Sequence, residues 1–221
     1  MPEAAEADAD LIPIARDKIA TMVDPKTTAL VVVDAQEDFI GPDGAMARVG
    51  VDLSSVPPAL AKVQELIAAA RKAGATVAFM RVVTTPDTDS QALKNFYTRR
   101  GFPLEAIGIC RDGTSGADYY GVTPEPGDIE IEKVLFSSFY GTDLEDQLRA
   151  RGIDTLVMTG FTTDCCVDAT SRDAFHRNFN VFLVDDACTA YPASLHDTAK
   201  IAIVKNVAIL TQADDVLAAW S

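Results

Sequence analysis

Residues 155–175, TLVMTGFTTDCCVDATSRDAF, contain the pattern that decides the fold. The apolar run Leu156–Met158 is typical of a strand that is buried on both faces of a parallel sheet. Gly160 permits a tight turn, and the TTD sequence that follows supplies caps for a helix predicted by the spacing of the next apolar residues. Cys165 and Cys166 therefore lie at a strand-to-helix elbow, where unpaired N–H groups and the helix dipole favour a thiolate.

The same alternation of strand and helix continues along the rest of the chain. We expect the other strands at Thr28–Val33, Ala75–Val82, Asp128–Lys133, Asn180–Val184 and Ala208–Leu210. Helical periodicity follows Pro58, Thr142 and Pro192, and it also covers Ala213–Trp220. This order predicts a three-layer α/β fold with a doubly wound, mostly parallel sheet and helices on both faces.

The length of 221 residues and the 48% hydrophobic content fit a single domain. We assign that domain to residues 26–221 and interpret the acidic, alanine-rich residues 1–25 as an N-terminal arm. Residues 84–127 are the least regular part of the sequence, and a long segment of this kind commonly shapes or covers a binding site.

Net charge argues against several classes of partner. A formal charge of -14 opposes binding to nucleic acids and to anionic membranes. The chain has no apolar run long enough for a membrane span, and its first residues lack the features of a secretion signal, so we expect a cytoplasmic protein.

The cysteines and histidines do not form a metal-binding pattern. Cys110 and Cys188 are expected to be structural, and all four cysteines are expected to be free thiols. The only histidines are His176, expected at a helix end, and His196, expected on the surface. We therefore expect neither a metal nor another cofactor.

Three chemically active side chains follow predicted strands. Asp34 ends the first strand, Lys133 ends the strand of alternating charge, and Cys166 lies at the elbow. The carboxyl ends of parallel strands meet at one edge of a doubly wound sheet, so these groups are expected to converge. A carboxylate, an ammonium group and a thiol in one site make a covalent catalyst possible.

Several separated motifs resemble the isochorismatase-like cysteine hydrolases, a group that includes N-carbamoylsarcosine amidase, nicotinamidases, ureidoacrylate amidohydrolases and biuret hydrolases. The resemblance is broad and follows the order of the family's motifs. The matching segments are Ala29–Phe39, Lys133 with Ser138–Phe139 and Thr142–Leu144, Thr159–Val167, Thr170–Ala174 and Val184–Ala187.

The resemblance implies a role for each group. Cys166 falls on the family's nucleophile, Asp34 on the base that takes its proton, and Lys133 on the cation that stabilises the negative charge. It also implies an oxyanion hole made by the N–H groups of Thr162 and Cys166, with a cis peptide bond before Thr162. The implied protein is a metal-independent amidohydrolase that forms a thioester and assembles as a homodimer or homotetramer.

Departures from the family narrow this interpretation. Nicotinamidases bind a metal through histidines, and no histidine precedes His176 here, so that branch is disfavoured. One alternative is a vinyl-ether hydrolase of the isochorismatase type, in which Asp34 protonates the substrate. Another is a binding protein that retains the elbow without catalysis.

The substrate-binding residues are the least determined part of the site. Gln36, Phe39, Tyr140 and Phe161 stand near predicted strand ends and are expected to line the pocket together with Thr162. Arg81 would suit a substrate carboxylate, or it could pair with one of the many acidic residues. The choice of amide or ureido substrate depends on residues 84–127.

Overall fold

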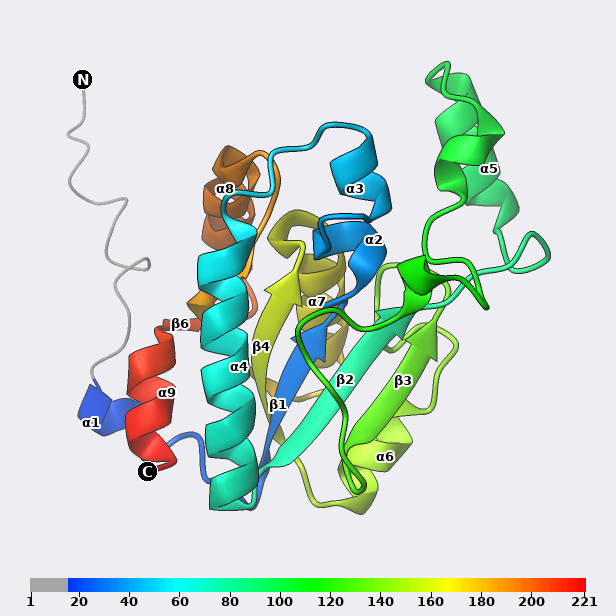
Figure 1. Cartoon of the computed structure of the whole chain (residues 1–221). Coiled ribbons are helices and arrows are strands. Elements are labelled where there is room, and N and C mark those ends of the chain that lie inside the picture. The colour runs from blue at the N-terminus through cyan, green and yellow to red at the C-terminus, as the bar shows by residue number, and fades with distance from the viewer. Residues whose placement is uncertain (1–15) are drawn as a thin grey trace, which may run out of the picture.

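The N-terminal segment packs on the end of the chain. The computed structural model describes residues 16–221, so residues 1–15 of the expected arm lie outside the described residues. In the remainder of that arm, α1 (Arg16–Ile19) packs beside α9 (Ala213–Ala219) (Figure 1). Ile19 and Val23 are buried, and the Trp220 indole Nε1 donates a hydrogen bond of 2.9 Å to the Val23 carbonyl oxygen.

A parallel sheet forms the centre of the protein. Within residues 16–221 it has six strands in the order β3-β2-β1-β4-β5-β6, and every neighbouring pair is parallel. The predicted fold class is therefore confirmed. The strands are β1 (Thr28–Val33), β2 (Thr76–Val82), β3 (Ile129–Lys133), β4 (Thr155–Phe161), β5 (Asn180–Thr189) and β6 (Ile209–Thr211).

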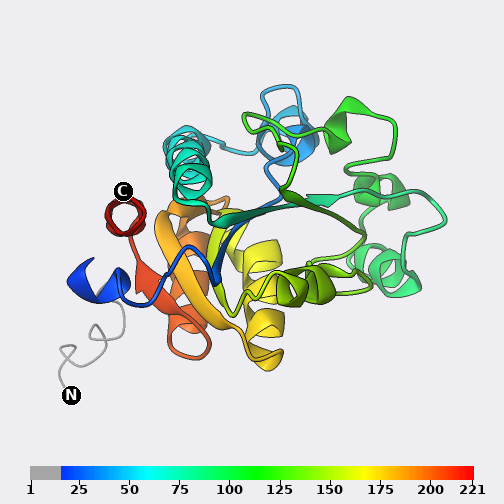
Figure 2. The same cartoon turned by 90° about the horizontal axis from the view of Figure 1, so that it is seen from below.

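Helices cover both faces of this sheet. The remaining helices are α2 (Glu37–Ile40), α3 (Ala45–Arg48), α4 (Val56–Ala73), α5 (Gln91–Arg99), α6 (Leu144–Ala150), α7 (Asp168–His176) and α8 (Ala193–Val204), with short turns η2 (Leu104–Ile107), η3 (Ser115–Ala117) and η4 (Thr163–Val167). α4 and α9 lie on one face, and α6 and α7 lie on the other (Figure 2). The result is the three-layer arrangement that alternating strands and helices favour.

Two apolar clusters form the core, one on each face. Leu30 and Val32 of β1 point toward α4, whereas Val31 and Val33 point toward the face covered by α6 and α7. All six residues of β1 and all seven of β4 are buried, as expected for central parallel strands. The edge strand β3 alternates between buried and exposed residues.

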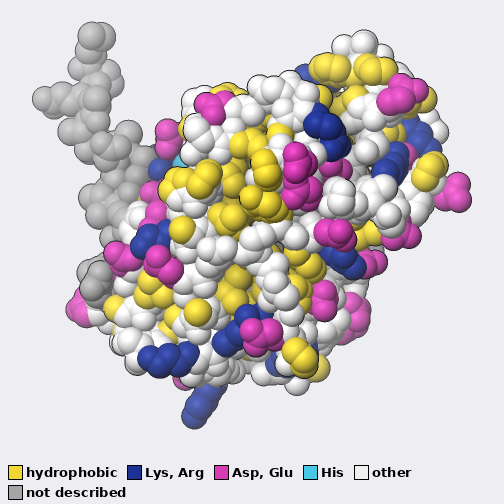
Figure 3. Space-filling model, viewed as in Figure 1, with side chains coloured by type: hydrophobic (Ala, Val, Ile, Leu, Met, Phe, Trp, Pro, Cys, Tyr) yellow, Lys and Arg dark blue, Asp and Glu magenta, His cyan; other side chains and the backbone are white. Residues whose placement is uncertain are grey.

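The segment between β2 and β3 is only partly regular. It contains α5, η2 and η3, and α5 projects away from the sheet beyond the carboxyl ends of β2 and β3 (Figure 1). On the face shown in Figure 3, Lys and Arg side chains lie among Asp and Glu side chains rather than in one basic surface. No helix within the described residues is long and apolar enough to cross a membrane.

Candidate active site

Asp34 occupies a special backbone position directly after β1. Its φ angle is 50°, in the left-handed region that Asp tolerates better than most residues. Its N–H donates to the Met80 carbonyl oxygen at 3.0 Å, which ties the end of β1 to β2. The side chain is fully buried, and its Oδ1 has no hydrogen-bond partner in the structure.

Lys133 reaches the same point from the end of β3. Its Nζ donates hydrogen bonds to Asp34 Oδ2 at 2.8 Å and to the Leu135 carbonyl oxygen at 3.1 Å. Both members of this ion pair have fully buried side chains. The pair therefore leaves one carboxylate oxygen of Asp34 available to another group.

The third group lies on the elbow after β4. Gly160 has a φ of 118°, and a Cβ there would lie 2.1 Å from the Val33 carbonyl oxygen, so only glycine allows β1 and β4 to approach this closely. The peptide bond between Phe161 and Thr162 is cis. The chain then enters η4, a single π-helical turn that continues into α7 and carries Cys166, of which only 7% is exposed.

These three residues perturb one another's ionisation. Burial raises the pKa of Asp34, and it outweighs the lowering effects of Lys133 and of the neighbouring Cys166 thiol. Burial lowers the pKa of Lys133, but attraction to Asp34 and Cys166 outweighs it, so the net shift is upward and the ammonium group persists. The buried site thus holds a cation beside an unusually basic carboxylate.

Cys166 differs from the sequence-based expectation. Hydrogen bonding with Cys165, burial and the charge of Asp34 raise its pKa well above that of an ordinary thiol, against the lowering effect of Lys133. The elbow therefore does not by itself make Cys166 a thiolate, because burial and the adjacent thiol oppose ionisation more than the elbow favours it. Reaction at Cys166 requires a base, and Asp34 is close enough to supply one.

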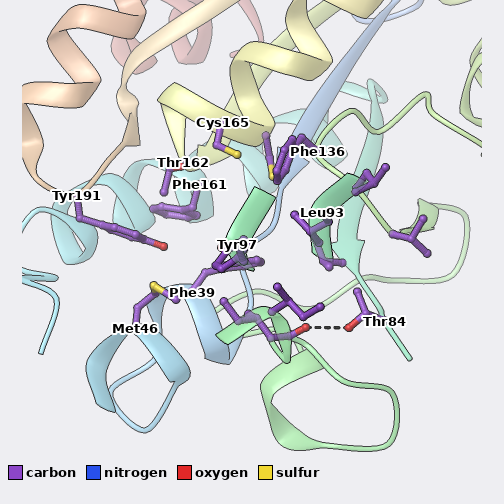
Figure 4. Close-up of a pocket in the computed structure, with 16 residues that line it drawn as sticks. Phe39, Met46, Thr84, Leu93, Tyr97, Phe136, Phe161, Thr162, Cys165 and Tyr191 are labelled. Atoms are coloured by element: carbon purple, nitrogen blue, oxygen red, sulfur yellow. Dashed lines mark hydrogen bonds between the residues drawn. The ribbon is translucent and has the colours of Figure 1, made fainter. Parts of the chain in front are cut away.

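A cavity of about 230 Å³ opens beside Cys166 at the carboxyl ends of the strands. Figure 4 shows Phe39 and Met46 on one side, Phe161, Thr162 and Tyr191 near the elbow, and side chains from α5 on the far wall. The lining residues are Phe39, Met46, Val82, Thr84, Leu93, Tyr97, Ile107, Ile109, Val134, Leu135, Phe136, Phe161, Thr162, Cys165, Cys166 and Tyr191.

Some expected binding residues line this cavity and others do not. Phe39, Phe161 and Thr162 lie in its wall. Tyr140 lies outside it and is 59% exposed. The expectation for Tyr140 is therefore wrong, because the turn after β3 directs it to solvent instead of the strand ends.

Gln36 and Arg81 are also absent from the wall. The Gln36 amide is buried and bonded to the backbone of Val82 in both directions, at 2.8 and 2.7 Å, so it joins two strand ends. Arg81 pairs with Glu132 and lies over the Tyr119 ring, with 5.4 Å between the guanidinium carbon and the ring centroid. Arg81 thus pairs with an acidic residue, as one of the two expectations held, and does not face the cavity as a partner for a substrate carboxylate.

The segment between β2 and β3 supplies wall residues that sequence reasoning did not identify. Leu93 and Tyr97 come from α5. Ile107 is the last residue of η2, and Ile109 is the second residue after η2. Their only signal in the sequence was membership of an irregular segment. Met46, Phe136 and Tyr191 had no signal, since each is an apolar or aromatic residue in an ordinary connection.

His196 supports the elbow instead of lying free on the surface. Its Nδ1 is 2.8 Å from Thr163 Oγ1, and its Nε2 is 2.9 Å from Asp185 Oδ1. Lys200 also contacts this carboxylate at 2.9 Å, and only 13% of the His196 side chain is exposed. The expectation of a surface histidine is wrong because α8 folds over η4.

Within residues 16–221, no group of three or more His, Cys, Asp or Glu side chains is arranged to hold a metal ion. The four cysteines are free thiols, and Cys110 and Cys188 are buried away from the cavity.

Comparison with known proteins gives a consistent result. The family model described as the isochorismatase domain matches residues 28–215. The chain is 38% identical over 190 residues to the ureidoacrylate amidohydrolase RutB of Methylobacterium radiotolerans, covering 80% of this chain and 73% of that protein. It is 33% identical over 210 residues to the protein of the same name from Pseudomonas syringae pv. syringae, covering 89% and 85%.

Solved structures share the fold. A cysteine hydrolase from Pseudomonas syringae pv. phaseolicola superposes with a TM-score of 0.79 at 26% identity, covering 90% of this chain and 94% of that one. N-carbamoylsarcosine amidase from Thermoplasma acidophilum gives a TM-score of 0.67 at 28% identity, covering 85% and 97%.

Proposed function

The chain belongs to the isochorismatase family, and from that premise we propose that it is a cysteine amidohydrolase that cleaves a carbon–nitrogen bond of a small amide or ureido compound. The names of the ureidoacrylate amidohydrolase relatives and of the N-carbamoylsarcosine amidase support this reaction class. The vinyl-ether alternative has no comparable support in the site, because a nucleophilic thiol faces the cavity.

One observation carries the proposal. Asp34 is held by Lys133 through one carboxylate oxygen, its other oxygen is unpartnered, and the Cys166 thiol is the neighbouring proton donor. A buried base with a raised pKa, a fixed cation and a thiol at a cavity wall are the groups that covalent amide hydrolysis requires.

The proposed reaction begins with proton transfer from the Cys166 sulfur to Asp34. The sulfur attacks the carbonyl carbon, and the N–H groups of Thr162 and Cys166 stabilise the oxygen anion that forms. Asp34 then returns the proton to the leaving nitrogen, the carbon–nitrogen bond breaks, and ammonia or an amine departs from a thioester. Water, deprotonated by Asp34, hydrolyses the thioester, and the proton returns to the sulfur. Lys133 keeps its positive charge throughout.

The test is the release of ammonia or an amine from a panel of small primary amides and ureas. We expect turnover by the wild type and a covalent adduct in its intact mass during turnover. Cys166→Ala should lose at least about 1,000-fold in kcat, because both the nucleophile and its proton are absent. Cys188→Ala is the matched control, since it removes a buried thiol outside the cavity, and it should retain activity.

Undiminished turnover by Cys166→Ala would refute the proposal. Consumption of isochorismate by that variant would instead support the vinyl-ether reaction.

The proposal includes a cytoplasmic location and assembly into a homodimer or homotetramer. Free thiols support the first point. Exposed apolar side chains on α7 and α8 support the assembly. Each of these side chains is at least 39% exposed, and they are Phe175, Leu195 and Ile201. Sedimentation equilibrium measures the assembly directly.

A further inference from the structure

The cavity beside Cys166 has an apolar wall. Most of the side chains facing the elbow are aliphatic or aromatic, and they come from α2, β2, α5 and the turn after β3. Figure 4 shows Phe39, Met46, Leu93 and Tyr97 grouped around the space in front of the elbow. None of the lining residues is Lys, Arg, Asp or Glu.

Four cations that neighbour or contact wall and site residues are held by acidic or carbonyl partners. Arg111 donates to the hydroxyl of the wall residue Thr84 at 3.1 Å, but its charge is paired by two hydrogen bonds of 2.7 Å to the carboxylate of Asp89. Lys94, which follows the wall residue Leu93, donates to the Pro86 carbonyl oxygen at 3.2 Å. Arg81 and Lys133 are held in the ion pairs described above. Within the described residues, the cavity thus offers a substrate carboxylate no cation of its own.

The reacting groups also disfavour an anionic substrate. Asp34 and Lys133 neutralise each other, and transfer of the Cys166 proton to Asp34 moves the negative charge to the sulfur without giving the site a net positive charge. A substrate carboxylate near that thiolate would be repelled and would lose its water without gaining an ionic partner. The formal net charge of the whole chain, -14, adds to this repulsion at long range.

The polar groups in the wall suit a neutral molecule. The Tyr191 side chain extends along the cavity with its hydroxyl oxygen toward the interior (Figure 4). Burial raises the pKa of this hydroxyl, so it remains a neutral donor and acceptor. Thr162 lies on the same side. An amide or urea group can bond with such neutral partners, while the opposite wall contacts an apolar substituent.

We propose that the substrate is a small neutral amide or monosubstituted urea with a short aliphatic or aromatic group, and that ureido acids are rejected. This inference rests on the proposed amidohydrolase function and specifies its substrate. The cavity volume of about 230 Å³ limits the substrate to a small compound. Ureidoacrylate carries a carboxylate, so the preference differs from the one named in the relatives.

An isosteric pair of ureas tests the proposal. Isobutylurea ends in an isopropyl group where N-carbamoylglycine ends in a carboxylate of similar size. The wild type should favour isobutylurea by at least about 100-fold in kcat/KM, because the acid buries an unpaired charge. An equal rate or a preference for N-carbamoylglycine would overturn the inference while leaving amide hydrolysis intact.

A second measurement separates this inference from the reaction itself. Calorimetric titration of Cys166→Ala measures binding in the absence of catalysis. Binding of isobutylurea but not of N-carbamoylglycine supports the substrate class even if the wild type hydrolyses neither, in which case only the proposed reaction fails. Tighter or equal binding of the acid, or no binding of isobutylurea up to its solubility limit, overturns the substrate class.

A positive charge placed in the wall should weaken the preference for the neutral urea. Leu93 is half-buried on α5, so a longer side chain can be accommodated there. Leu93→Arg should raise kcat/KM for N-carbamoylglycine by at least about tenfold, whereas the uncharged control Leu93→Gln should not. Equal responses of the two variants would overturn the role assigned to the missing cation.

Discussion

Replacement of Lys133 by methionine tests how much folding free energy is lost when Asp34 is buried without its cation. The substitution keeps most of the side-chain volume but removes the ammonium group that bonds Asp34 at 2.8 Å. Asp34 is then left fully buried with neither carboxylate oxygen paired to a cation. An uncompensated buried charge of this kind costs about 3–5 kcal/mol of folding free energy.

The size of this loss should depend on pH. Asp34 escapes the cost by taking up a proton, and in the unfolded chain an aspartate titrates near pH 3.9. For a carboxyl group that stays protonated in the folded state, stability falls by about 1.4 kcal/mol for each pH unit above that value. Lys133→Met should therefore lose about 1.5 kcal/mol at pH 5 and about 4 kcal/mol at pH 7.

Urea unfolding followed by tryptophan fluorescence measures these values. The chain has one tryptophan, and Trp220 is 3% exposed, so its emission should change when the protein unfolds. The double variant Asp34→Asn/Lys133→Met removes both charges, and asparagine also tolerates the left-handed backbone of residue 34. It should recover most of the stability while remaining inactive.

Two outcomes would refute this reasoning. A stability loss in Lys133→Met that does not change between pH 5 and pH 7 would mean that Asp34 is not the group left unpaired. The single variant Asp34→Asn completes the comparison. A double variant whose stability loss equals the sum of the losses in Lys133→Met and Asp34→Asn would show that the two charges are not coupled.

Two pH-dependent effects provide further tests. Because Asp34 must be ionised to act as a base and burial raises its pKa, kcat/KM should fall toward low pH with a midpoint above the value of about 3.9 of an exposed aspartate, and a rate unchanged down to pH 4 would contradict its role. Burial raises the pKa of Asp185, but hydrogen bonds from His196, Lys200 and Gln212 outweigh it and lower the pKa to about 2, so this carboxylate stabilises the fold above pH 4. Asp185→Asn should thus lose about 2 kcal/mol at pH 7 in urea unfolding, and the difference should disappear as the pH falls to about 2; a loss that persists there would contradict the assignment.

The positions of Asp34, Lys133 and Cys166 at strand ends could be predicted from the sequence. Each follows a short segment whose apolar pattern is local and strong, and in a parallel sheet such ends meet at one edge. The buried pair between Asp34 and Lys133 is consistent with that prediction. The ionisation of Cys166 could not be predicted, because it depends on burial and on contacts made only in the folded chain.

The sequence by itself thus determined the order of strands and helices and the edge of the sheet where the reactive groups lie, since both follow from periodicity over a few residues. Only the tertiary structure decided the chemistry of the cavity wall. Strand register places Arg81 opposite Glu132, which removes from the site the cation that a carboxylate would need. Leu93 and Tyr191 enter the wall from segments far apart in the chain, and no local pattern specifies such contacts because they depend on how separate elements pack.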